Sequence, residues 1–532
     1  MDIQTKEMLK EHFTPESPLG PISSDHIYDP EVMKYLFNTE NRIYSDVLNK
    51  PSIIVGRRGA GKTAFLRSVK LDGKYQVIAE IRTHEAFRYV ATTIQRLSKE
   101  IHFIESIAEV WEAVIWGAIF LELVRILDKE DEDKIIISKY LKHIGLKKEG
   151  DSDDLIKLVV DALTANGKIS WAFIASILFK KLTDTPTFAL TKETAEKILE
   201  TRKMKAIVLI DSLEDFSLEK ADVSRALSGL LKCIGSFRDR NKLAAARFCI
   251  PSELWYPFSD LSSNPLKDFR NRILIHWHAG ELLIIAASKL AIYLEIHETE
   301  FFNQNRIASL DLEQRDDCQK LFKLIMPEFV VNGLGKEEEP IAYILRHTQL
   351  LPRQLFTIIN SIVQKNNSLG GCLTNLTEKA IKEGVYESEK ELTDEIFAAY
   401  RFSYPQAKNV CERSIPYLPF KFTVGHLHHV FNQHGKKASG YQEFNDYLRL
   451  LLEIGAVGRV IDDGEMDRYI IGEFEYTLPH KLNTSTDDDL CLHPSFCQVF
   501  SAIYPAEDKR VIYPYGSAAN GEDHRSSYQH RA

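Results

Sequence analysis

One octapeptide constrains the fold of this 532-residue chain more than any other feature: GRRGAGKT at residues 56–63 matches G-x-x-x-x-G-K-[ST] at every fixed position. It follows the apolar, strand-like run PSIIV at residues 51–55 and precedes the helical pattern KTAFLRSVKL. Glycines allow a tight turn whose backbone N–H groups point at phosphate oxygens, and the next helix presents its positive N-terminal end. Lys62 is expected to reach the β- and γ-phosphates and Thr63 to ligate Mg²⁺. The residues expected to contact the nucleotide are Gly56, Arg57, Gly59, Ala60, Gly61, Lys62, Thr63 and Ala64.

The alternative interpretation of this loop is a glycine turn that carries an incidental lysine. With average residue usage, the pattern arises by chance in about one chain in a hundred of this length. The strand before the loop and the helix after it favour nucleotide binding. Arg57 and Arg58 either add phosphate contacts or face solvent.

A second motif follows the most apolar strand candidate, KAIVLI at residues 205–210, which ends at Asp211. A phosphate loop needs a carboxylate at the tip of a neighbouring strand to position Mg²⁺, and Asp211 is predicted to supply it together with Thr63. Glu214, or failing that Asp215, is predicted to polarise the attacking water. The predicted catalytic set is therefore Lys62, Asp211, Glu214 and Asp215. The alternative interpretation is an acidic helix cap after a strand.

Strands alternate with helices along the first half of the chain, which predicts an α/β fold: a parallel P-loop NTPase sheet with a helical insertion. Further strand candidates are YQVIAEI, LAAARFCI and RILIHW, and the run AVIWGAIFL at residues 113–121 is too short to span a membrane and predicts a buried helix. The predicted divisions are an N-terminal segment 1–24, an ATPase core 25–280 with an insertion at 85–182, a helical lid 281–390, a C-terminal winged-helix-like α+β domain 391–505 and a disordered tail 506–532.

Composition limits the compartment and the partners. The formal net charge is −9, which argues against a protein coated in nucleic acid. Seven scattered cysteines without a CxxC pair indicate a reducing compartment, and the N-terminus lacks the apolar run of a signal peptide. A cytoplasmic protein with no membrane contact is predicted.

GRRGAGKT together with IVLIDSLED resembles the STAND/NACHT class of P-loop NTPases, which are relatives of the AAA+ ATPases. In that class the second motif ends in Asp, a small residue, any residue and two acidic residues. Here these are Asp211, Ser212, Leu213, Glu214 and Asp215, with Glu where Asp is more usual. The resemblance covers residues 25–385, and the chain departs from NACHT proteins in having no repeat array after the ATPase region.

The resemblance implies further nucleotide contacts. Ser252 matches a polar sensor position, Arg270 and Arg272 lie where such enzymes offer an arginine finger, and Arg353 in HTQLLPRQL matches a lid sensor. Ion-paired surface arginines are the alternative interpretation. The segment 26–30 is a candidate adenine contact or a simple turn.

The same resemblance implies ATP and Mg²⁺ as ligands, a homo-oligomer that forms on ATP binding, a protein partner or effector, and a regulatory switch of the kind used in bacterial defence against phage. ATP is expected rather than GTP, since no guanine-reading N-K-x-D run is present. One alternative is a nucleotide-ordered scaffold without turnover.

The other alternative is a DNA-loading ATPase, suggested by a helix and two strands around the turn at residues 462–465. A preceding helix carries basic side chains: Lys421, His426, His428, His429, Lys436 and Lys437. The acidic turn would be repelled by phosphate, so DNA contact is predicted to be less favoured than protein contact.

Overall fold

The computed structural model describes residues 1–22, 29–37, 44, 52–81, 104–128, 130–143, 186–211, 221–255, 272–463, 469–478, 480–505 and 510–517. The chain divides into two compact units. One unit comprises residues 28–275, and the other combines residues 1–27 with residues 276–532. From the sequence, the corresponding boundaries are predicted after residues 24 and 280.

A five-stranded, wholly parallel sheet forms the centre of the unit 28–275, with strand order β2-β3-β4-β1-β5. Its strands are β1 Ile53–Gly56, β2 Val77–Ile81, β3 Ala206–Ile210, β4 Ala244–Pro251 and β5 Arg272–Ile275. Each corresponds to a strand predicted from an apolar run. Every residue of β3 is buried, as expected for a central parallel strand covered on both faces.

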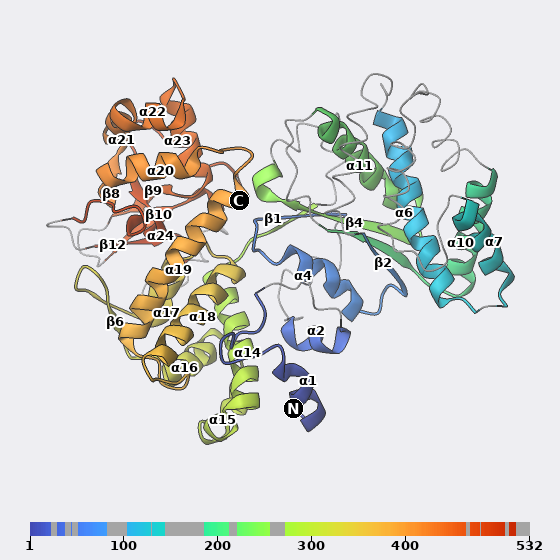
Figure 1. Cartoon of the computed structure of the whole chain (residues 1–532), viewed down its shortest axis with the longest axis horizontal. Helices are drawn as coiled ribbons and strands as arrows, with labels where there is room; N and C mark the ends of the chain where they lie inside the picture. Colours follow the sequence, from blue (N-terminus) through green and yellow to red (C-terminus); the bar gives the residue numbers. More distant parts are fainter. Residues whose placement is uncertain are drawn as a thin grey trace. The chain divides into compact units, whose positions relative to one another are not determined.

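Helices lie on both sides of this sheet, α6 and α11 on one side and α4 and α2 on the other (Figure 1). The described helical segments of this unit are α2 Pro30–Leu36, α4 Lys62–Arg67, α6 Ile104–Ile126, α7 Glu132–His143, α10 Pro186–Thr201 and α11 Ala221–Arg240, with 3₁₀ turns η1 Ser68–Leu71 and η2 Ser252–Leu254. The layers confirm the predicted α/β P-loop NTPase fold class.

The apolar run at residues 113–121 lies inside helix α6, as predicted. Trp116 and Phe120 are fully buried. Trp116 packs on Phe237 of α11, with the two ring centroids 6.2 Å apart. No helix among the described residues combines the length and apolarity needed to cross a membrane.

The second unit begins with helix α1, Ile3–Lys10, which packs on helix α14, Ala279–His297. The Lys6 ammonium donates to the Glu295 carbonyl at 3.1 Å, and the His297 ring contacts the Phe13 carbonyl at 2.7 Å. The helical region continues through α15 Thr299–Gln304, η3 Ile307–Ser309, α16 Arg315–Ile325, α17 Pro340–Arg346, α18 Pro352–Ser368 and α19 Glu378–Ala399, with a short hairpin of β6 Val330–Val331 and β7 Glu337–Glu338.

The C-terminal part of this unit is an α+β fold built on a second sheet, ordered β12-β10-β9-β11-β8. Its strands are β8 Lys421–Thr423, β9 Val457–Asp462, β10 Tyr469–Glu473, β11 Asp489–Leu492 and β12 Val511–Pro514. Its helical segments are α20 Ala407–Ser414, η4 Ile415–Tyr417, α21 Val424–Val430, the π-helical η5 Phe431–Gly435, α22 Lys436–Ser439, α23 Phe444–Glu453, η6 Glu475–Thr477 and α24 Pro494–Cys497.

The predicted order of a helix followed by two antiparallel strands is present as α23, β9 and β10. The tail requires a correction. Residues 511–514 fall in the segment predicted to be disordered from residue 506, yet they form strand β12 and pair in parallel with β10 from Tyr469 onward. The apolar run VIY allows this segment to bury its side chains against the sheet.

Candidate functional site: the phosphate loop

The loop between β1 and α4 requires glycine at three positions. Gly59 and Gly61 adopt left-handed conformations with φ of 84° and 85°, which side chains with a Cβ rarely adopt. A Cβ on Gly56 would lie 3.2 Å from the Ile275 Cβ, so β5 leaves little room there. Backbone conformation therefore explains Gly59 and Gly61, and the close approach of β5 explains Gly56.

Lys62 begins helix α4 and is 4% exposed. Its ammonium group donates to the Arg57 carbonyl at 3.1 Å, so the side chain folds back across the loop that precedes it. An ammonium group held beside the backbone of this loop is positioned to neutralise a phosphate bound there.

Thr63 and Asp211 are brought together, as the sequence predicts. The Thr63 hydroxyl donates to Asp211 Oδ1 at 3.2 Å, although 148 residues separate the two along the chain. Asp211 directly follows β3, and its backbone N–H donates to the Ile81 carbonyl at 3.3 Å, which fixes the strand end. A hydroxyl and a carboxylate side by side are the hard oxygen ligands that Mg²⁺ prefers, so these residues fit the predicted ion.

Glu253 is a site residue that the sequence analysis missed. Its carboxylate accepts a hydrogen bond from the Arg58 backbone N–H at 2.9 Å, while Ser252, the predicted sensor, lies beside it with its hydroxyl 3.5 Å from the Glu253 carboxylate. Both residues follow β4, which neighbours β1 in the sheet. The available signal was the polar Ser-Glu pair at a strand end, where ligands of parallel sheets bind.

A buried ion pair anchors the helix that follows the loop. Arg67 of α4 is 3% exposed, and its guanidinium lies 2.7 Å from the carboxylate of Glu80 on β2. Lys70 approaches the same carboxylate at 3.4 Å. Because breaking such a pair leaves an uncompensated buried charge, it holds α4 in a fixed position relative to the sheet.

Among the remaining predicted contacts, the described structure does not bring Arg272 to the loop of its own unit, and Arg353 stays a prediction. Arg272 is exposed at the amino end of β5, opposite the end that carries the loop, and its guanidinium lies 4.8 Å from the centre of the Trp255 ring. Arg353 belongs to the other unit, where it forms an ion pair with Glu395 at 3.6 Å. Some predicted residues lie outside the described residues: the segment 26–28, Ser212, Leu213, Glu214, Asp215 and Arg270.

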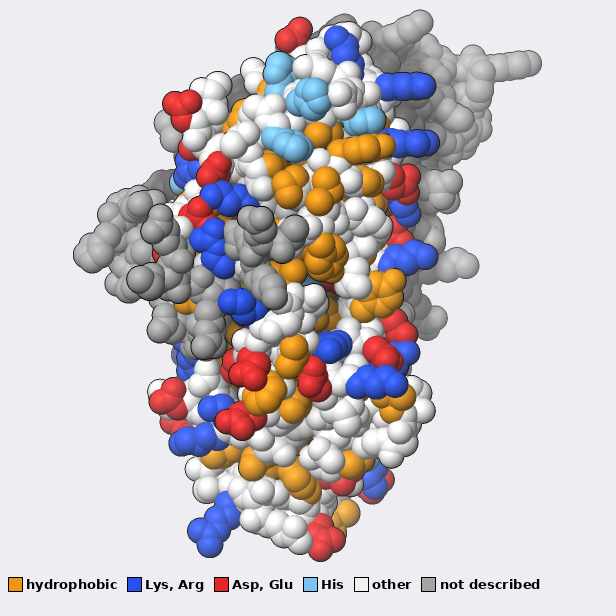
Figure 2. Space-filling model, turned by 90° about the vertical axis from the view of Figure 1, so that its left-hand side faces the viewer, with side chains coloured by type: hydrophobic (Ala, Val, Ile, Leu, Met, Phe, Trp, Pro, Cys, Tyr) orange, Lys and Arg blue, Asp and Glu red, His pale blue; other side chains and the backbone are white. Residues whose placement is uncertain are grey.

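One residue of the basic surface predicted for the C-terminal part, Lys421, is held in ion pairs. Lys421 is neutralised by Asp463 and by Asp489, the latter at 2.9 Å. The other predicted basic residues lie on α21 and α22 and are all exposed: His426, His428, His429, Lys436 and Lys437. Figure 2 shows histidines gathered near the top of this face beside apolar side chains.

Comparisons with known proteins support no family assignment. No protein-family model matches the chain, and neither does any curated protein. Similar solved structures include the ORC2 protein of Aeropyrum pernix in ADPNP–ADP complexes, at 11% identity, with coverage of 81% of this chain and 86% of that chain and a TM-score of 0.34. The Aeropyrum pernix ORC1 protein in complex with DNA is 12% identical, with 91% and 97% covered and a TM-score of 0.32.

Cdc6p from Pyrobaculum aerophilum is 11% identical, with 91% of this chain and 96% of that chain covered and a TM-score of 0.29. At these scores the likeness carries no weight by itself. The fold assignment rests on the parallel sheet and on the phosphate loop between β1 and α4.

Proposed function

We propose that this chain binds ATP with Mg²⁺ in the loop 56–63 and hydrolyses it, and that it works as a regulatory switch. The observation that supports this most strongly is the contact between Thr63 and Asp211 at 3.2 Å. If the loop were only a glycine turn with an incidental lysine, a threonine hydroxyl would not be expected to contact a carboxylate at the end of a different strand. A magnesium–nucleotide site requires that pairing.

In this proposal each side chain has a defined task. The loop N–H groups and Lys62 bind the phosphates, and Thr63 and Asp211 hold the Mg²⁺, which neutralises phosphate charge when it is bound. Glu214 or Asp215 orients and polarises the attacking water. Ser252, Arg270, Arg272 and Arg353 are further candidate nucleotide contacts, with Arg270 and Arg272 acting on a neighbouring subunit.

Equilibrium binding and steady-state turnover test the proposal with the full chain. Lys62→Ala should weaken ATP binding about a hundredfold, because a charge-assisted hydrogen bond to phosphate is lost. Lys74→Ala is the matched control, since Lys74 is an exposed lysine of the same unit. If both variants bind ATP as the wild type does, the loop is not a nucleotide site.

A second pair of variants locates the group that activates water. Glu214→Gln should retain ATP binding and lower turnover by about a hundredfold or more, whereas Asp215→Asn should have the smaller effect. The reverse order would assign the role to Asp215. A wild type that binds ATP but shows no turnover would instead support the scaffold alternative.

The switch part of the proposal rests on the resemblance to STAND and AAA+ proteins, which implies an ATP-dependent homo-oligomer and a protein effector. The mass of the particle with and without ATP tests it, since a switch should shift to a larger assembly. A role in defence against phage has the same basis, and phage plating on cells with wild-type or Lys62→Ala protein tests it.

DNA loading is less supported, because Lys421 is neutralised by two aspartates.

A further inference from the structure

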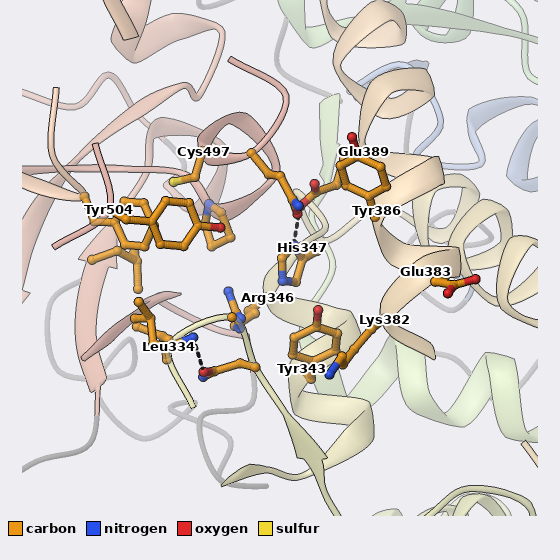
Figure 3. Close-up of a pocket in the computed structure, with 17 residues that line it drawn as sticks. Leu334, Tyr343, Arg346, His347, Lys382, Glu383, Tyr386, Glu389, Cys497 and Tyr504 are labelled. Carbon is orange, nitrogen blue, oxygen red and sulfur yellow. Dashed lines mark hydrogen bonds and ion pairs between the residues drawn. The ribbon is translucent and has the colours of Figure 1, made fainter. Parts of the chain in front are cut away.

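A cavity of about 300 Å³ lies within the unit that contains the C-terminal half of the chain, far along the sequence from the phosphate loop. It is bordered by helices α17 and α19 on one side and by the C-terminal α+β fold on the other (Figure 3). Its volume is at the lower end of the range for small-molecule sites and exceeds the space of a single water molecule about tenfold.

Aromatic rings form much of the wall of this cavity: Tyr343, Tyr386, Phe420 and Tyr504. Phe420 and Tyr504 meet edge to face with ring centroids 5.1 Å apart, while Tyr343 is only 8% exposed. Figure 3 shows the hydroxyl groups of Tyr343 and Tyr504 directed toward the space between them. Neither hydroxyl has a hydrogen-bond partner among the described residues. The cavity therefore offers flat apolar surfaces together with two unused polar groups.

His347 and Glu389 lie at the inner side of the cavity and contact each other at 2.6 Å between Nδ1 and Oε1. Burial lowers the pKa of His347 well below its usual value and raises the pKa of Glu389 well above its own, so both groups favour their neutral forms. Within the described residues, His347 Nε2 and Glu389 Oε2 have no partner. If Nδ1 donates to Oε1, Oε2 carries the carboxyl proton and Nε2 is an acceptor. If Oε1 donates to Nδ1, Nε2 carries the imidazole proton and Oε2 is an acceptor. In both arrangements, one of the two atoms without a partner is a donor and the other is an acceptor.

The charged side chains around the cavity are already compensated. Arg346 forms two hydrogen bonds with Glu338, at 2.8 and 3.0 Å. Lys382 lies 3.1 Å from Glu378, and the carboxylate of Glu383 lies 3.8 Å from both Lys365 and Lys379. Of these pairs only Arg346–Glu338 is buried, and a carboxylate or phosphate ligand would have to compete with Glu338 for Arg346, so the lining favours an uncharged ligand.

We propose that this cavity binds an uncharged heteroaromatic compound of nucleoside size, with its ring against Tyr504 and its polar edge toward the Tyr343 hydroxyl. Rings stack on aromatic side chains, and ring nitrogens and carbonyl groups supply both donors and acceptors. A purely hydrocarbon ring would leave the tyrosine hydroxyls without partners, which costs binding free energy.

Saturation-transfer-difference NMR on the full chain, with adenosine, guanosine, uridine and cytidine as probes, tests this site. Nucleosides lack phosphate, so binding should be unchanged in Lys62→Ala, and ribose alone should not bind. Tyr343→Phe, which removes one oxygen atom, should weaken binding about fivefold. Tyr504→Ala, which removes a stacking surface, should weaken it about tenfold or more.

Tyr417→Ala is the matched control, because Tyr417 is about as exposed as Tyr504 but does not line the cavity. Unchanged near-ultraviolet circular dichroism and melting temperature would show that the variants fold. The proposal is overturned if no nucleoside binds at millimolar concentration, if Tyr343→Phe and Tyr504→Ala bind as the wild type does, or if Lys62→Ala abolishes binding.

Discussion

Lys289 of helix α14 shows how one buried cation affects the stability of this protein. Its ammonium group lies 5.8 Å from the centre of the Phe13 ring and 5.4 Å from that of Phe356, and burial lowers its pKa to about 8 from 10.5. Between these two values the unfolded chain binds a proton that the folded chain does not. Stability should therefore rise as the pH rises through that window, and the burial penalty is fully present below pH 8.

Replacing this lysine with an uncharged side chain of similar length should stabilise the protein at neutral pH. Lys289→Met is expected to raise the free energy of unfolding by roughly 2 to 3 kcal/mol at pH 7, with the lost cation–π contacts offsetting part of the gain. Urea unfolding at pH 7 and at a pH above 9 measures the difference between the two proteins. That difference should shrink at the higher pH, and a constant difference would contradict the expected titration.

Glu253 tests how far a neighbouring strand supports the phosphate loop. Its carboxylate accepts from the Arg58 backbone N–H, so Glu253→Ala should weaken ATP binding about fivefold by leaving that part of the loop unsupported. Glu253→Gln keeps an acceptor oxygen and should bind ATP within about twofold of the wild type. Equal affinities of the Ala and Gln variants would show that the contact does not support the nucleotide site.

At the scale of elements, a single glycine controls the packing of α18 against α19. A Cβ on Gly384 would lie 2.5 Å from the Ile362 Cα and 2.7 Å from its backbone nitrogen. Because backbone atoms cannot rotate aside as side chains do, Gly384→Ala should force the helices apart and destabilise the protein by about 1 to 3 kcal/mol. The melting temperature measures this effect.

Gly425 of α21 is the matched control for that helix crossing. A Cβ there would meet only the Thr423 hydroxyl, at 3.7 Å, and the position is exposed. Gly425→Ala should leave stability unchanged or raise it by up to about 1 kcal/mol, since alanine favours the helix. If both substitutions had the same effect, close helix packing would not be the cause.

The elements also show which features a sequence can predict. The five strands of the parallel sheet were predictable because each is a continuous apolar run between turn residues. Strands β8, β11 and β12 were not, because β8 and β11 begin with a charged residue and β12 adjoins a polar tail, so each is recognisable only from its pairing with a segment distant in the sequence. Glu253 was missed for a related reason: its contact depends on β4 lying next to β1, which local sequence does not specify.

At the scale of the whole molecule, the switch and the scaffold differ in whether nucleotide bound in the unit 28–275 affects the other unit. In a switch, ATP should alter the helical region that contains Arg353, whereas in a nucleotide-ordered scaffold its effect should stay in the unit that binds it. Hydrogen exchange by mass spectrometry separates the two outcomes, because a ligand slows exchange wherever it stabilises the fold.

We expect ATP with Mg²⁺ to protect residues 56–63 and 206–211, and also the first turns of α18, which begins at Pro352. Arg353→Ala should retain protection of the loop and remove it from α18, while Arg413→Ala, an exposed arginine of the same unit, should behave as the wild type. Protection confined to residues 28–275 would favour the scaffold, because a ligand shifts a second region only through a free energy that couples the two.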